Sequence, residues 1–256
     1  MDLYGASPKL LEYIEEVKEA THTPISILPY ADATPADNFQ AQFLFGPSFP
    51  NIEIRYRPLR VLLDNFVETL IAHELTHALT IYSSGFLMPN GPTTASAYDV
   101  QTAANIIDLI DDVIVDVLIY RRNFNVTAKE FQERIRNNLN ILLRVKSLSE
   151  INTYQPDPVR AEIKLVSDYI HSWALPKYIH MDSSVEAVYN AYTQQFPQAL
   201  KVPFKKAKAI KKSFLANDIF SVEGRNRVVI DALLLWLANK KIDLSRISPP
   251  PPKLPT

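Results

Sequence analysis

One short stretch of this sequence decides how the rest is interpreted: IAHELTHAL at residues 71–79. The stretch lies within residues 61–82, where apolar residues recur at the intervals of an amphipathic helix. On such a helix His73 and His77, four residues apart, lie on one face, and both imidazoles can reach a single ion. Glu74 lies beside that face. The pattern therefore predicts a helix that carries two metal ligands and a carboxylate.

This combination of residues suits metal-assisted hydrolysis. Zinc lowers the pKa of a coordinated water to about 7, and a carboxylate beside that water can accept its proton during attack. His73 and His77 would hold the ion, and Glu74 would be the general base. The alternative is a surface helix with two solvated histidines, which the apolar neighbours Leu75 and Leu79 disfavour.

A catalytic zinc usually has three protein ligands, so a third is expected from another element. Residues 105–119 form an almost wholly apolar segment in which Asp108, Asp112 and Asp116 recur every four residues, as one stripe of a helix. Buried carboxylates require cations, donors or a metal as partners. We favour a metal, and the alternative is pairing with arginines, for which the candidates are Arg121, Arg122, Arg134 and Arg136.

These two segments together resemble the gluzincin metallopeptidases, typified by thermolysin, over roughly residues 50–122. In that group a second helix carries Asn-Glu-x-x-x-Asp, and Asp111-Asp112-Val113-Ile114-Val115-Asp116 is similar to it without a gap. The resemblance implies Asp112 as the third zinc ligand and Asp116 as the acceptor for the ring N–H of His73. It does not extend to the metzincins, because no third histidine follows His77 at the required spacing.

Aspartate replaces glutamate at position 112, and its side chain is one methylene shorter. Either the two helices approach more closely, or another residue is the ligand. The other candidates for the third ligand are Asp108, Asp111, His171 and His180.

The resemblance also implies how a peptide would bind. An edge strand ahead of the motif helix, for which residues 51–57 are placed, would pair with an extended substrate; an ordinary half-exposed strand is the alternative. A tyrosine, histidine or arginine near the metal would stabilise the oxyanion. The candidates by residue type are Tyr98, Tyr154, Tyr169, His171, Tyr178 and His180.

The amino-acid composition limits the kinds of protein and of site that this chain can form. The 256 residues are 47% hydrophobic and 21% charged, which is typical of a globular protein, and the formal net charge is -1. The absence of cysteine excludes disulfides, thiolate metal sites and thiol nucleophiles. The N-terminus lacks the features of a signal peptide and no segment reaches the length of a membrane span, so we expect a cytoplasmic protein.

The periodicity predicts an α+β fold, with a small N-terminal sheet packed on a zincin-like active-site helix and a mostly α-helical remainder. The sheet would be antiparallel or mixed. Strands are expected at 24–29, 42–45 and 51–57, and helices at 8–20, 60–83, 99–123, 127–147, 157–173, 183–196, 203–215 and 223–240. Three parts follow: a metallopeptidase core at 1–125, a helical portion at 126–247 and a proline-rich flexible tail at 248–256.

The sequence therefore predicts a hydrolase with one Zn²⁺ that cleaves peptide bonds in a peptide or protein substrate. The alternative is a non-catalytic, metal-containing binding or regulatory protein on the same fold. Neither a membrane nor nucleic acid is an expected partner, because the charge is balanced. The lysine-rich run at 205–212 is interpreted as a solvated helix face, with contact to nucleic acid or an acidic partner as the alternative.

Overall fold

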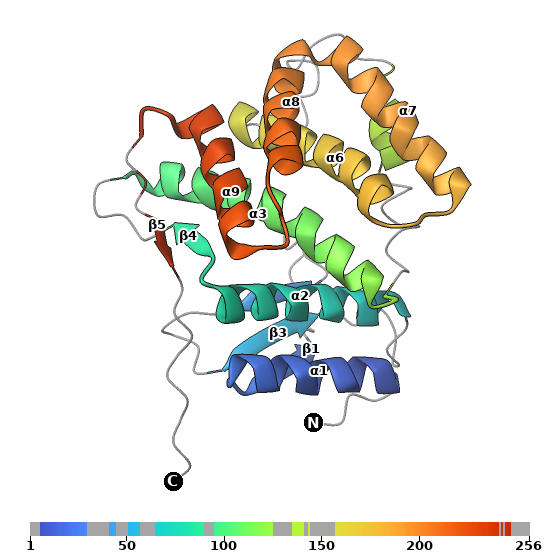
Figure 1. Cartoon of the computed structure of the whole chain (residues 1–256), viewed down its shortest axis with the longest axis vertical. Helices are drawn as coiled ribbons and strands as arrows, with labels where there is room; N and C mark the ends of the chain where they lie inside the picture. The colour runs from blue at the N-terminus through green and yellow to red at the C-terminus, as the bar shows by residue number, and fades with distance from the viewer. Residues whose placement is uncertain are drawn as a thin grey trace. The chain divides into compact units, whose positions relative to one another are not determined.

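The structure, a computed structural model, describes residues 6–29, 41–44, 51–56, 65–89, 95–124, 135–140, 143, 157–240, 242 and 244–246. Its described part is mostly helical and contains a small three-stranded mixed sheet, which confirms the α+β class (Figure 1). The chain divides into two compact units. The first contains residues 1–85, 118–127 and 247–256, and the second contains residues 86–117 and 128–246. Of the described helices, none is long and apolar enough to cross a membrane.

The first unit begins with helix α1 (Pro8–Thr21), whose start and end are both specified locally. Ser7 caps the N-terminus by accepting a hydrogen bond from the Leu10 N–H, and Pro8 occupies the first turn, where no N–H is needed. The helix ends at His22, which has a left-handed backbone conformation with φ 50°. Leu10, Tyr13 and Val17 are buried, so one face of α1 contributes to the core of this unit.

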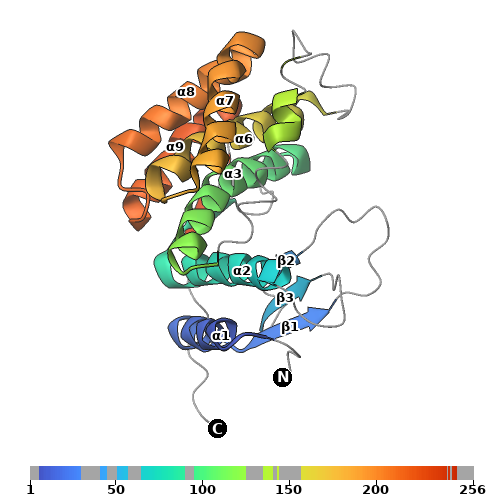
Figure 2. The same cartoon turned by 90° about the vertical axis from the view of Figure 1, so that its right-hand side faces the viewer.

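The sheet of the first unit has the order β1-β3-β2, with β1 (Ile25–Pro29), β2 (Ala41–Leu44) and β3 (Ile52–Tyr56). β1 is parallel to β3, and β2 is antiparallel to it. Along β3, Ile52, Ile54 and Tyr56 are buried while Glu53 and Arg55 are half-buried, so the alternation expected from the sequence is confirmed. Figure 2 shows α1 and helix α2 (Asn65–Ser84) beside these three strands.

The central position of β3 corrects one expectation. Residues 51–57 were predicted to form an edge strand that pairs with an extended substrate, but β3 is hydrogen-bonded to β1 on one side and to β2 on the other. Its backbone groups are therefore already paired, and a peptide cannot add to it. Among the described strands β1 and β2 are the edges, and α2 packs on β2 and β3.

Most of the second unit is helical. Helix α3 (Ala97–Arg121) belongs to this unit up to Val117, and its last turn belongs to the first unit. The remaining helices are α6 (Pro158–Tyr178), α7 (Ser183–Ala199), α8 (Lys201–Ala216) and α9 (Val222–Leu237), and packing contacts connect α6 with α7 and α8, and α8 with α9. Asp157, Asp182 and Ser221 cap α6, α7 and α9 through their side chains.

Several boundaries differ from those expected. A second sheet was missed: β4 (Leu87–Pro89) pairs antiparallel with β5 (Leu244–Arg246), and both strands are too short to produce an alternating pattern. α6 continues through Pro176 to Tyr178, because a proline in the last turn removes only one backbone hydrogen bond. Of the helix expected at 127–147, only residues 135–140 are described as helical, and the tail at 248–256 lies outside the described residues. The division into three functional parts stays a prediction.

Candidate metal centre

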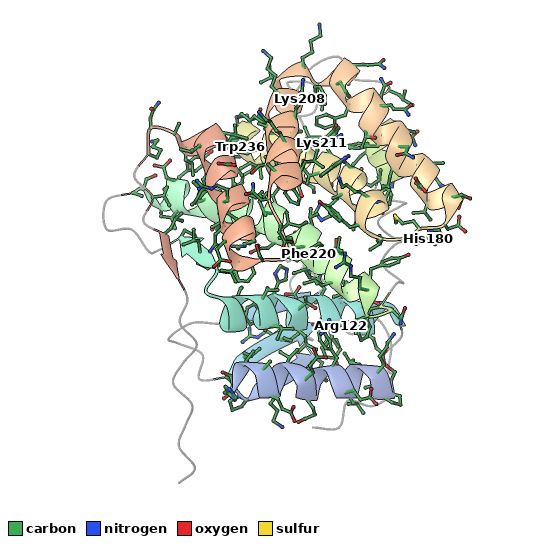
Figure 3. The ribbon with its side chains drawn as sticks, viewed as in Figure 1. Arg122, His180, Lys208, Lys211, Phe220 and Trp236 are labelled. Atoms are coloured by element: carbon green, nitrogen blue, oxygen red, sulfur yellow. The ribbon has the colours of Figure 1, made fainter. Side chains whose placement is uncertain are left out.

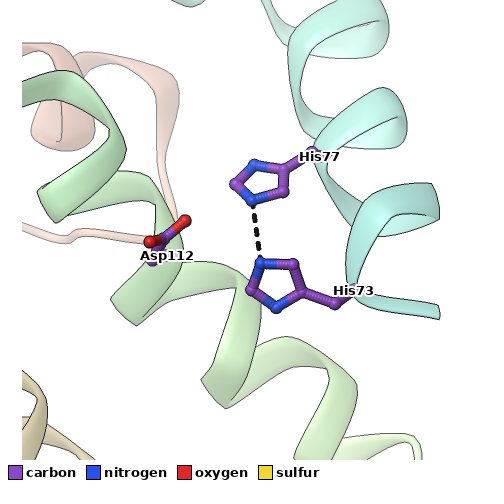
Figure 4. Close-up of side chains that lie close together, drawn as sticks. All are labelled: His73, His77 and Asp112. Atoms are coloured by element: carbon purple, nitrogen blue, oxygen red, sulfur yellow. Dashed lines mark hydrogen bonds between the residues drawn. The ribbon is translucent and has the colours of Figure 1, made fainter. Parts of the chain in front are cut away.

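The motif helix α2 brings its two histidines together. The Nε2 atoms of His73 and His77 face each other at 3.0 Å, and the rings meet edge to face with centroids 4.7 Å apart (Figure 4). Both side chains are half-buried. In neutral imidazoles facing at this distance, one Nε2 must carry a proton. A cation can instead be shared by both lone pairs. An approach of this kind therefore suits a bidentate site for a metal ion.

The residues around the histidines hold this helix by its opposite side. Ile71, Ala72, Leu75 and Ala78 are fully buried, which removes the apolar side of α2 from water. Thr76, inside the motif, is 1% exposed. Its hydroxyl lies 2.7 Å from the Ala72 carbonyl oxygen and 2.7 Å from the hydroxyl of Tyr13 on α1. The motif is thus anchored to the core through the residue immediately before His77.

A second polar contact fixes the start of α2 against α1. Both carboxylate oxygens of Glu68, which is buried, accept hydrogen bonds from Ser7: one from its backbone N–H and the other, at 2.8 Å, from its hydroxyl. Ser7 also caps α1. A carboxylate in the first turn of a helix interacts favourably with the helix dipole. Glu68 therefore has a structural role and is not available for chemistry.

Glu74 follows His73 on the same helix and is half-buried. It does not belong to the buried side of α2 that Ala72 and Leu75 form, and it is not a partner in the hydrogen bonds of Thr76 with Tyr13 or of Glu68 with Ser7. A half-buried carboxylate next to a histidine that could hold a metal ion keeps access to water while its surroundings are partly desolvated. This is a suitable environment for a general base.

The aspartate stripe of α3 runs from solvent into the core. Asp108 is exposed, Asp112 is half-buried and Asp116 is buried. Of these, Asp112 belongs with His73 and His77 to a group that could hold a metal ion: each of the three offers one ligand atom, and these atoms lie within 4.8 Å of one another (Figure 4). Among the histidines and carboxylates that the structure describes, no second group brings three or more potential ligand atoms this close together.

Asp116 has a partner that the sequence did not indicate. Its Oδ2 lies 3.4 Å from Nε2 of His171 on α6, and both residues are buried. The Nδ1 atom of His171 lies 3.0 Å from the carbonyl oxygen of Ser167, which can only accept, so Nδ1 carries the donating proton. The contact between Nε2 and Oδ2 is an ion pair when the imidazole is protonated. The expected role of Asp116 toward His73 stays a prediction.

Asp111 is taken up by an ion pair, which removes it from the candidates for the third ligand. Both its carboxylate oxygens accept from the guanidinium of Arg225 on α9, with Nε at 2.7 Å. Arg225 is 0% exposed; it also donates to the Leu87 carbonyl and to the Asn226 side chain, and its guanidinium lies over the ring of Phe86. A bidentate, fully desolvated contact of this kind fixes α3 one residue before Asp112.

One of the arginines proposed from the sequence as partners of the stripe, Arg122, has a different ion-pair partner in the structure. Arg122 pairs with Glu16 on α1 and lies over the ring of Tyr13. The partner of Asp111 is Arg225, which is more than one hundred residues away in sequence. In the sequence Arg225 and Arg227 both precede the apolar run VVIDALLLWL, and no local pattern distinguishes the buried Arg225 from the exposed Arg227.

The residues proposed as oxyanion stabilisers have different surroundings. The Tyr98 hydroxyl donates to Asp157 at 3.1 Å. The rings of Tyr169 and Tyr178 pack on other aromatic rings, and burial raises the pKa of both hydroxyls. His180 is exposed (Figure 3), His171 is paired with Asp116, and Tyr154 lies outside the described residues. None of these observations assigns the oxyanion stabiliser.

Comparisons with known proteins add no relative. No protein-family model matches the chain, and neither a curated protein nor a solved structure matches it. The resemblance to gluzincins therefore rests on the two short segments around His73 and Asp112.

Proposed function

We propose that this protein is a zinc-dependent hydrolase that cleaves peptide bonds. The observation that carries the proposal is the group of His73, His77 and Asp112, with Glu74 next to the first ligand on the same helix. Two imidazoles and one carboxylate are the protein ligands of a known class of catalytic zinc site, in which a fourth position stays open.

The spacing of the histidine nitrogens supports zinc as the ion. Zn–N bonds of about 2.0–2.1 Å at a tetrahedral angle place two nitrogens about 3.4 Å apart. The observed separation of 3.0 Å between the Nε2 atoms differs from this by a small side-chain rotation. The chain contains no cysteine, so a purely structural thiolate site is impossible, and the nitrogen and oxygen donors suit zinc better than a soft metal.

A zinc ion held there supplies a Lewis acid and makes a water molecule reactive at neutral pH. Residues of the chain transfer the proton and orient the ligands. Glu74 accepts the proton of the attacking water at its carboxylate and returns it to the leaving amine. Asp116 accepts the ring N–H of His73 and keeps that imidazole in the tautomer that ligates through Nε2, as such partners do in other metal sites.

Strand β2 is the element proposed to bind the substrate, in place of β3. It is antiparallel to β3, lies at one edge of the described sheet and packs on α2, the helix with the metal ligands. An extended peptide can add to such an edge through main-chain hydrogen bonds, with little dependence on its sequence. We propose a peptidase rather than another hydrolase because this edge strand can hold a peptide by its backbone.

Metal analysis of the purified chain is the first test. We expect about one zinc per chain, loss of tight binding in His73→Ala, His77→Ala and Asp112→Ala, and retention in Asp108→Ala, the matched change one turn away on the exposed end of the stripe. If Asp108→Ala lost tight zinc binding and Asp112→Ala kept it, the assignment of Asp112 as the third ligand would be wrong. Absence of zinc or another transition metal even after reconstitution would refute the proposal.

The second test separates a hydrolase from a non-catalytic metal protein. Glu74→Gln should still bind zinc but lose at least about a hundredfold in the cleavage rate of a fluorogenic peptide library, because only the proton acceptor is removed. Turnover retained by this variant would contradict the role of Glu74. Zinc binding by a wild type that cleaves no peptide would favour the regulatory alternative.

A further inference from the structure

Helix α8 carries an unusual concentration of positive charge. It contains six lysines and no acidic residue, although the whole chain has a formal net charge of -1. Two of these lysines have partners inside the second unit. Lys206 pairs with the buried Glu162 at 2.6 Å and lies 4.5 Å from the ring centre of Trp236, and Lys211 lies 5.0 Å from that of Trp173. Those two therefore fix α8 to its neighbours.

The other four lysines, Lys201, Lys205, Lys208 and Lys212, are all exposed. Their spacing of four, three and four residues places them on one face of α8 as a straight row, about 16 Å long. None of them forms an ion pair with another residue that the structure describes. Figure 3 shows Lys208 in this row and Lys211 beside it. Four like charges along one line repel each other and attract a partner of opposite charge.

The residues beside the lysine row indicate the kind of partner. Val202, Ala209 and Ala216 follow one another at intervals of seven residues and are exposed, with Val202 at 62%. This spacing lies along one side of a helix and allows close approach of a second helix. No arginine or aromatic side chain lies in the row itself, as stacking on nucleic-acid bases would require. The opposite face of α8 is buried, so the helix cannot insert into a membrane.

From this arrangement we propose that the exposed face of α8 docks an acidic amphipathic helix of a partner protein. Its glutamates or aspartates, three and four residues apart, face the lysine row, and its apolar residues lie on Val202, Ala209 and Ala216. Charge complementarity sets the orientation and the association rate, and the apolar contacts add the desolvated part of the interface. This surface does not depend on the metal centre, so the docking stands or fails independently of hydrolysis.

A synthetic amphipathic peptide with glutamates at this spacing beside leucines serves as the probe, with its binding to the full chain followed by fluorescence anisotropy. The variant Lys205→Glu/Lys208→Glu should bind at least about tenfold more weakly, since two attractive pairs become repulsive. The matched control is Lys164→Glu/Arg227→Glu, which changes the net charge equally at two exposed positions on α6 and α9. It should bind within about twofold of wild type.

A charge-swapped peptide with lysines in place of the glutamates should bind the Lys205→Glu/Lys208→Glu variant and not the wild type. The proposal is overturned if the control variant weakens binding as much as the test variant. It is equally overturned if a scrambled peptide of the same composition binds as well, or if a single-stranded oligonucleotide binds the row more tightly than the peptide does.

Discussion

Arg225 is the residue whose removal should be most costly. Its guanidinium is fully buried, and both oxygens of Asp111 depend on it. Arg225→Met leaves the Asp111 carboxylate buried without its charge partner, so we expect a loss of about 3–5 kcal/mol in the free energy of unfolding, measured with urea. Arg227→Met, at an exposed position on the same helix, should change it by less than about 0.5 kcal/mol.

The double variant Asp111→Asn/Arg225→Met provides the internal check on this prediction. It removes both charges together, so the double variant should be more stable than Arg225→Met alone. If the two substitutions instead added independently, the ion pair would not be the source of the loss.

The hydroxyl of Tyr13 produces a pH dependence of stability. Burial, only partly offset by the hydrogen bond to Thr76 and by the charge of Arg122, raises the pKa of Tyr13 above its ordinary value of 10.0. Because the folded state holds this proton more tightly than the unfolded chain, the contribution is complete below pH 10. It is lost as the pH rises further, through the raised pKa of the folded state.

Tyr13→Phe removes this titration and keeps the ring on which Arg122 and Phe124 pack. We therefore expect the unfolding free energy of wild type to fall more steeply than that of Tyr13→Phe between about pH 9.5 and 11. Thr76→Val is the companion variant, since it keeps the phenol but removes its hydrogen-bond partner. Parallel curves for wild type and Tyr13→Phe over this range would show that Tyr13 ionises as it does in the unfolded chain.

At the scale of the element, Gly224 is required where α9 begins. A Cβ at this position would lie 2.0 Å from the carbonyl oxygen of Asp218 in the preceding turn. Gly224→Ala in an open helix would raise stability by up to about 1 kcal/mol. Here we expect the opposite sign, a loss of about 1–3 kcal/mol in urea unfolding, because the turn has to move.

Asn190→Ala, at an exposed position of α7, is the control for the helical preference of alanine alone. It should leave the unfolding free energy unchanged or slightly raised. Stabilisation by Gly224→Ala of the same size as by Asn190→Ala would mean that the turn at Asp218 yields without cost.

For several helices and one strand, the sequence pattern was sufficient to predict the element. α1, α2 and α7 to α9 lie close to the expected ranges, because apolar residues repeat along them with helical spacing and Ser7, Asp182 and Ser221 provide local start signals. The alternation of Ile52, Ile54 and Tyr56 correctly predicted a strand with one buried face. It could not predict that this strand is central, since pairing on both sides depends on β1 and β2.

At the scale of the whole molecule, metal binding should stabilise the folded chain. Zinc bound by His73, His77 and Asp112 as proposed would add about 2.7 kcal/mol at one hundred times its Kd, because the three side chains are assembled only in the folded state. We expect the thermal unfolding midpoint of wild type to rise with zinc and to return to its starting value with a chelator. His77→Ala should lose this response, whereas His180→Ala, at an exposed histidine, should keep it.

A zinc response that persists in the double variant His73→Ala/His77→Ala would place the stabilising site elsewhere on the chain. The measurement does not require turnover, so it tests the metal site separately from the proposed hydrolysis.

The sequence by itself determined the α+β class and the pairing of His73 with His77. It also singled out Asp112 as a candidate ligand. These features depend on local geometry, because a spacing of four residues on a helix brings side chains together wherever the helix lies. Only the tertiary structure decided that β3 is central, that Arg225 is the partner of Asp111 and that His171 is a partner of Asp116. Each of these features joins segments that are distant in sequence. The position of a strand in a sheet depends on which strands lie beside it, and a buried charge is tolerated only where the fold brings a partner close to it.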